Sequence, residues 1–208
     1  MAARVAACAA VWTIIAIVTR RTLLALSAAG LMHAAKPRLS RARVSAITDE
    51  MAPTQADAVS AAHEFGFEFV ELRNVPETGK PFSSLSDPEL KRWASELQAS
   101  RLKVSVLHAA APSPSAAAIL GAAAVWPPDL DPGKVGAWTP TENWKEDWRQ
   151  VRATHIVSVR VPAATLHTLN WKGILEMLQK DGYSGTLTVE KGDLESIRDL
   201  IHMIGMVA

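Results

Sequence analysis

The sequence predicts an α/β fold, an incomplete parallel (β/α) barrel with about six of the eight strands of a full barrel. Two observations carry this prediction. Between Val44 and His108, strand-like segments alternate with helical runs, and polar residues close three successive strand-like segments. Near the end of the chain, another strand-like segment closes on Glu190, before an amphipathic run.

The first connecting helix is predicted over Thr54 to Phe65. Its alanines and Phe65 recur at helical spacing, Pro53 suits a first turn, and Gly66 is a stop signal. The second follows Ser86, a suitable N-cap residue, and carries an apolar stripe. The stripe consists of Leu90, Trp93, Ala94 and Leu97.

Polar side chains at the ends of the first three strand-like segments are candidate site residues, because parallel strands place their carboxyl ends on one face. They are Asp49, Glu50, Glu71, Arg73 and His108. We expect Glu71, Arg73 and His108 to bind substrate, with Arg73 as the partner of Glu71. The alternatives are a local surface pair of Glu71 with Arg73, and a loop position for His108.

The stretch 109–124 is almost pure alanine with interspersed proline and serine, and it predicts a linker that runs into a short apolar helix or strand. A full barrel takes about 250 residues, so the chain is shortened near this stretch. Open strand edges follow from the shortening, and they favour self-association into a homo-oligomer.

Two further apolar features lie in the domain of residues 41–208. Trp126, Trp138, Trp144 and Trp148 cluster in a short segment, and we expect them to pack rather than to stack on a sugar. In the tail, the spacing predicts one helical face. That face consists of Leu194, Ile197, Ile201 and Ile204.

Residues 1–40 form a separate segment, and residues 41–208 form the barrel-like domain. Arg20 and Arg21 precede a short run of small apolar residues over 25–32, as in a twin-arginine export signal. The prediction is an exported, periplasmic protein, with a true translation start near Val18 or Thr19. The alternative is a membrane anchor in contact with the bilayer through residues 1–32.

Composition excludes several classes of function. The net charge of +1 gives no basic field for nucleic acid. The single cysteine, Cys8, lies in the presumed leader, so the body has no cysteine chemistry. The segment around Gly133 lacks the spaced glycines of a phosphate-binding loop.

Two blocks of sequence are similar to a known family. The first contains Ile47-Thr48-Asp49-Glu50-Met51-Ala52-Pro53, Glu64-Phe65-Gly66-Phe67-Glu68-Phe69-Val70-Glu71-Leu72-Arg73 and Leu85-Ser86-Asp87-Pro88-Glu89-Leu90-Lys91. The second runs from Leu169-Asn170-Trp171 to Gly185-Thr186-Leu187-Thr188-Val189-Glu190. Together they resemble the sugar phosphate isomerase/epimerase family, the xylose-isomerase-like TIM barrels.

The resemblance implies proton transfer next to a sugar carbonyl, assisted by a divalent metal such as Mn²⁺ or Mg²⁺. It implies that Glu190 is a catalytic residue and a metal ligand, and that Asp131 is a second ligand, with Asp129 in competition. In the strand where the family carries two histidines, this chain has Ser158 and Arg160, and strand alternation puts both on one face.

Arg160 suggests a different site, because a fixed cation would pair with Glu190 or Asp131 and occupy the space of the metal. That arrangement makes a structural ion pair or a binding site for anionic ligands, and Arg160 is a candidate substrate-binding residue. The first function class is therefore a sugar (phosphate) isomerase or epimerase. The alternatives are a noncatalytic, degenerate barrel that binds a carbohydrate or a partner, and a membrane-tethered fragment without activity.

Overall fold

The computed structural model describes residues 38–109, 114–126, 136–152 and 154–207. The predicted export signal with Arg20 and Arg21, and the predicted ligand Asp131 with its competitor Asp129, lie outside these residues. Within the described ranges, no helix is both long and apolar enough to cross a membrane.

Seven parallel strands are present in the described part of the chain, one more than expected. They are β1 (Val44–Ala46), β2 (Phe69–Leu72), β3 (Lys103–His108), β4 (Ala124–Trp126), β5 (Gly136–Trp138), β6 (Ile156–Pro162) and β7 (Thr186–Glu190). They form two sheets, with the orders β1-β7-β6-β5 and β2-β3-β4, and each pairing within them is parallel. The predicted α/β class is confirmed.

The two sheets meet at one parallel bridge, between Ile47 and Glu71. Through this bridge the strands follow one another as β4-β3-β2-β1-β7-β6-β5. No pairing joins β4 to β5 within the residues that are described, so the strands there do not form a closed barrel.

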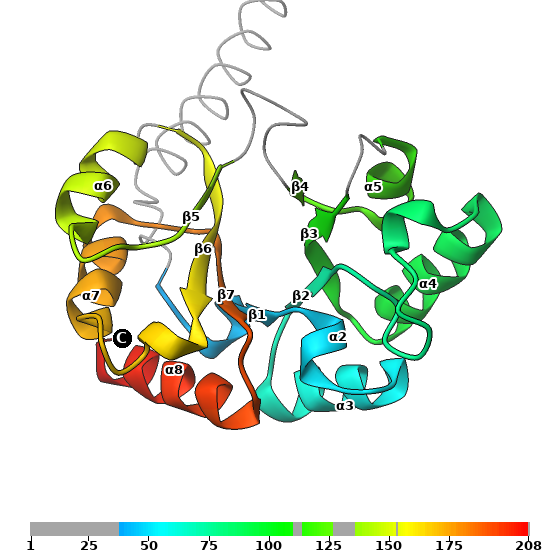
Figure 1. The fold of residues 1–208 in the computed structure, drawn as a ribbon, viewed down its shortest axis with the longest axis horizontal. Helices are drawn as coiled ribbons and strands as arrows, with labels where there is room; N and C mark the ends of the chain where they lie inside the picture. The colour runs from blue at the N-terminus through cyan, green and yellow to red at the C-terminus, as the bar shows by residue number, and fades with distance from the viewer. Residues whose placement is uncertain (1–37, 110–113, 127–135, 153, 208) are drawn as a thin grey trace, which may run out of the picture. The chain divides into compact units, whose positions relative to one another are not determined.

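The helices lie outside the strands, with α6 to α8 beside one sheet and α3 to α5 beside the other (Figure 1). They are α2 (Thr48–Met51), α3 (Gln55–Phe65), α4 (Asp87–Ala99), α5 (Pro114–Leu120), α6 (Trp144–Val151), α7 (Trp171–Asp181) and α8 (Leu194–Val207). Short 3-10 turns occur at Arg41–Arg43, Phe82–Ser84 and Ala163–Thr165. Such an arrangement buries one face of each sheet under helices.

Local sequence signals explain the ends of α3 and α4. The Thr54 side chain accepts a hydrogen bond from the Asp57 backbone N–H, and Gly66 ends α3 with a left-handed φ of 72°. Pro53 lies before this helix rather than in its first turn. Ser86 is the N-cap of α4, as predicted, and it forms a capping box with Glu89.

Helix α5 lies within the alanine-rich stretch, and strand β4 begins at its last residue, where a linker running into a short helix or strand was expected. Three of the clustered tryptophans are buried, and Trp138 packs on Trp148 with ring centroids 5.1 Å apart. Packing is therefore the role of Trp138, Trp144 and Trp148, as predicted, whereas Trp126, for which packing was also predicted, is only partly buried.

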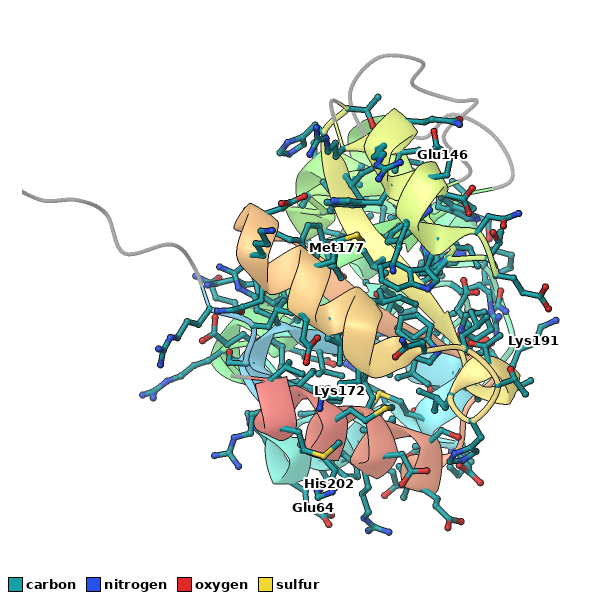
Figure 2. All side chains as sticks on the ribbon, turned by 90° about the vertical axis from the view of Figure 1, so that its left-hand side faces the viewer. Glu64, Glu146, Lys172, Met177, Lys191 and His202 are labelled. Atoms are coloured by element: carbon teal, nitrogen blue, oxygen red, sulfur yellow. The ribbon has the colours of Figure 1, made fainter. Side chains whose placement is uncertain are left out.

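The buried face of α8 differs from the prediction. Leu200 lies in the core with Ile197 and Ile204, whereas Leu194 is 37% exposed and Ile201 is only partly buried. Figure 2 shows α7 and α8 lying next to each other, and their contacts confirm that they pack together. Both helices present exposed polar residues to solvent, such as Lys172 and His202 (Figure 2).

Strand alternation places two kinds of side chain on the two faces of β6 and β7. Val159, Val161, Leu187 and Val189 belong to the apolar core. The residues between them are polar but equally buried. They are Ser158, Arg160, Thr186 and Thr188. A buried polar layer therefore lines the face away from this core, and it requires internal hydrogen bonds.

Candidate functional site

A buried ion pair lies in the polar layer, between Glu71 of β2 and Arg160 of β6. Arg160 Nη1 lies 2.5 Å from Glu71 Oε2, and the two side chains are 1% and 0% exposed. Taking two such charges out of water is costly, so each needs further hydrogen bonds to be stable. We use the name Arg160 cluster for this pair and its neighbours. The cluster consists of Glu71, His108, Ser158, Arg160, Thr188 and Glu190.

Glu71 has partners on both carboxylate oxygens. Thr188 Oγ1 donates to Oε1 at 2.6 Å, and Ser158 Oγ donates to the same oxygen at 3.3 Å. His108 Nε2 lies 2.9 Å from Oε2. Burial raises the pKa of Glu71, but the His108 hydrogen bond and the Arg160 charge outweigh it, so the pKa lies below its usual value. Glu71 is therefore a fixed, ionised member of the cluster.

Glu190 faces the same guanidinium from the carboxyl end of β7. Its Oε1 lies 3.3 Å from Arg160 Nη1, and its side chain is 28% exposed. Burial raises the pKa of Glu190, and although Arg160 opposes this, the charges of Glu71 and Glu50 add to it, so the pKa lies above its usual value. Glu190 is thus the most accessible carboxylate of the cluster and the one that most readily takes up a proton.

One edge of the Arg160 guanidinium differs from the edge that binds Glu71 and Glu190. Nε and Nη2 are buried and have no hydrogen-bond partner among the described residues. The guanidinium carbon lies 5.0 Å from the ring centroid of Trp126, which ends β4 and is only partly buried. Because buried N–H groups are normally satisfied, acceptor atoms are expected next to these two donors.

Arg73 does not pair with Glu71, contrary to the prediction. It is 36% exposed and binds Asp49 at 2.8 Å and Glu50 at 2.7 Å. Glu50 also accepts the Lys191 backbone N–H at 2.7 Å. These residues form a second ion-pair group, which fixes α2 against the ends of β2 and β7. Arg73 therefore has a structural partner set of its own.

Other predicted site residues are in the cluster. His108 ends β3 and points at Glu71, so the alternative of a free loop position is wrong. Ser158 and Arg160 share one face of β6, as alternation predicted, and Arg160 pairs with Glu190 as expected. His155 is exposed and lies before β6.

The residues present do not suit a divalent metal at this position. The ranges that the structure describes contain no group of three or more His, Cys, Asp or Glu side chains arranged to hold a metal ion. Arg160 lies between Glu71 and Glu190 and already occupies the position between these two carboxylates. Glu190, the ligand that the resemblance implied, pairs with Arg160 in this structure.

Sequence reasoning missed Thr188 and the hydroxyl contacts of Ser158. Thr188 lies two residues before Glu190, so the alternation of β7 already placed both on one face. Its partner Glu71 is 117 residues away in the chain, and no local pattern relates the two.

Comparison with known proteins gives no family. No family model matches the chain, and no curated protein matches it. A crystal structure of the Amycolatopsis orientalis BexX/CysO complex is similar at 14% identity and a TM-score of 0.29, over 78% of this chain and 64% of that chain. The chain thus spans less than two thirds of that protein, and so low a TM-score carries no argument about fold or function.

Proposed function

We propose that the protein is a noncatalytic, TIM-barrel-like carbohydrate-binding protein, in which Arg160 stands where xylose-isomerase-like proteins hold a metal. The consecutive order of parallel strands supports the barrel-like relationship. The binding role depends on one observation: Nε and Nη2 of Arg160 are buried and have no partner within the described ranges.

The charges of the cluster favour a neutral ligand over an anion. Two carboxylates, Glu71 and Glu190, face one guanidinium, which leaves net negative charge around Arg160. The neighbouring group of Asp49, Glu50 and Arg73 also has two carboxylates and one guanidinium, and so it is net negative as well. An added phosphate or carboxylate would meet this repulsion, whereas hydroxyl and carbonyl oxygens would not.

A sugar offers the groups that these residues need. Two adjacent oxygens of a sugar would accept hydrogen bonds from the Nε and Nη2 edge of Arg160, since this fork is planar and rigid. A hydroxyl would donate to the carboxylate of Glu190, which is partly exposed. The partly buried ring of Trp126 would supply an apolar face for the C–H groups of the sugar.

A second candidate is a sugar isomerase or epimerase that works without a metal. Glu190, with its raised pKa, and His108, held by Glu71, offer two groups for moving a proton next to a carbonyl. Arg160 would then stabilise negative charge on the carbonyl oxygen.

The test is a calorimetric titration of the full chain with D-xylose, D-fructose and D-fructose 6-phosphate in the presence of EDTA. We expect saturable binding of a neutral sugar, weaker binding of the phosphate ester, and loss of binding in Trp126→Ala and Arg160→Lys. Arg92→Met, an exposed helix residue, is the matched control. The absence of any sugar binding, or binding that requires Mn²⁺, would contradict the proposal.

Deuterium incorporation separates the two candidates. The protein is incubated with the sugar that binds in D₂O, and the carbon next to the carbonyl is followed by NMR. The binding role predicts no exchange above the uncatalysed rate. Exchange that disappears in Glu190→Gln would establish the isomerase or epimerase instead.

A further inference from the structure

A small cavity opens at the amino ends of the strands, opposite to the end that carries Glu190. Its volume is about 170 Å³. Its walls come from residues at or next to the first positions of several strands. The lining includes Arg43, Phe69, Ala123, His155, Ile156 and Ser184.

The inner part of this cavity suits an apolar group of a ligand. Phe69, Ile156 and Val157 supply apolar walls. The buried hydroxyls at its inner end already donate, from Ser105 to the Val70 carbonyl at 3.2 Å and from Thr186 to the Val157 carbonyl at 3.3 Å. Because these protons are committed, they do not require a polar group of the ligand.

The rim is cationic. Arg43 lies 5.7 Å and Lys103 lies 5.4 Å from the ring centroid of Phe69. Lys103 also has an exposed partner in Glu68 at 3.8 Å, which offsets its charge. Arg43 Nη1 donates a hydrogen bond to the Ser184 carbonyl at 2.6 Å, and this acceptor is neutral. The positive charge of Arg43 therefore has no carboxylate partner among the described residues.

A second hollow adjoins this rim and shares His155, Ile156 and Ser184 with it. It has a volume of about 380 Å³ and contains Asp181, which accepts the Trp148 indole N–H at 2.8 Å and lies 3.8 Å from Arg152. The Asp181 carboxylate therefore has partners other than Arg43. The uncompensated charge at the shared rim is that of Arg43.

We infer that the 170 Å³ cavity binds a small monocarboxylate whose body is one ring or a short chain. The apolar body fills the space between Phe69 and Ile156, and the carboxylate pairs with Arg43 at the mouth. The volume fixes the size class, because an apolar cavity of about 150 Å³ holds one benzene molecule. This site is separate from the Arg160 cluster and does not depend on a carbohydrate ligand.

The experiment is a ligand-observed NMR titration of the full chain with benzoate. Benzyl alcohol, which has the ring without the charge, and acetate, which has the charge without the ring, are the comparison probes. We expect benzoate to bind saturably, and each comparison probe to bind at least about tenfold more weakly, since a charge-assisted hydrogen bond or the burial of a ring is worth that factor.

Two variants test the location. Arg43→Met keeps the stem but removes the charge, and should weaken benzoate by about tenfold or more. Ala123→Leu, at an exposed position on the mouth, should block entry. Arg92→Met is the control for lost surface charge and should bind as the unmodified chain does.

Circular dichroism melts establish that each variant is folded. Benzoate binding that is absent, or unchanged in both Arg43→Met and Ala123→Leu, would overturn the inference. If Arg43→Met does not fold, the decision rests on Ala123→Leu and on the ranking of the three probes. In that case, equal affinities for benzoate and benzyl alcohol would also overturn the inference.

Discussion

Replacement of Arg160 by methionine should strongly destabilise the protein. The change removes the cation next to Glu71 and leaves a carboxylate with 0% side-chain exposure. Breaking a buried pair in this way typically costs about 3–5 kcal/mol. Glu71 keeps its contacts with Thr188, Ser158 and His108, so we expect a loss near the lower limit, about 3 kcal/mol.

The assay is urea unfolding followed by circular dichroism, with the midpoint and the slope fitted separately. The double variant Glu71→Gln with Arg160→Met provides the control, because it removes the charge that the single variant leaves unpaired. We expect the double variant to be more stable than Arg160→Met alone. A single-variant loss below about 1 kcal/mol, or a double-variant loss equal to the sum of both single losses, would refute the reasoning.

Three further predictions follow from burial, charge and capping. The pKa of Glu190 is higher in the folded than in the unfolded protein, so the free energy of unfolding falls as pH rises from about 4.5 through the folded pKa. Glu190→Gln should make this fall smaller when unfolding is measured from pH 4 to 8. In α8, Leu200→Ala should cost about 2–5 kcal/mol in urea unfolding, whereas Leu194→Ala should cost about 0.5 kcal/mol or less; equal losses would contradict the observed face. Ser86→Ala should cost about 1 kcal/mol by removing the α4 capping box, and no change in the unfolding midpoint would show that the box is not stabilising.

The part of the fold that depends on neighbours in sequence was predictable. The α3 and α4 caps follow from Thr54, Gly66 and Ser86, whose side chains or backbone freedom act within a few residues. Strand alternation was enough to put Ser158 and Arg160 on one face of β6.

The partners of buried charges were not predictable in the same way. Arg73 was expected to serve Glu71 because they are two residues apart, but it pairs with Asp49 and Glu50, which α2 brings to it. Glu71 instead meets Arg160 across 89 positions of the chain. Likewise, the helical spacing of α8 allowed two adjacent faces, and packing against the core selected the one with Leu200.

The proposed binding role depends most on Arg160, the central cation, whose Nε and Nη2 have no partner among the residues that the structure describes. The Nε–H signal of Arg160 in a proton–nitrogen NMR spectrum, assigned through its loss in Arg160→Lys, tests this directly. We predict that the signal shifts on addition of the neutral sugar that binds, and that it stays sharp with an equimolar amount of paramagnetic Mn²⁺. Broadening by Mn²⁺ together with no response to the sugar would show that a metal, rather than a sugar, occupies this place.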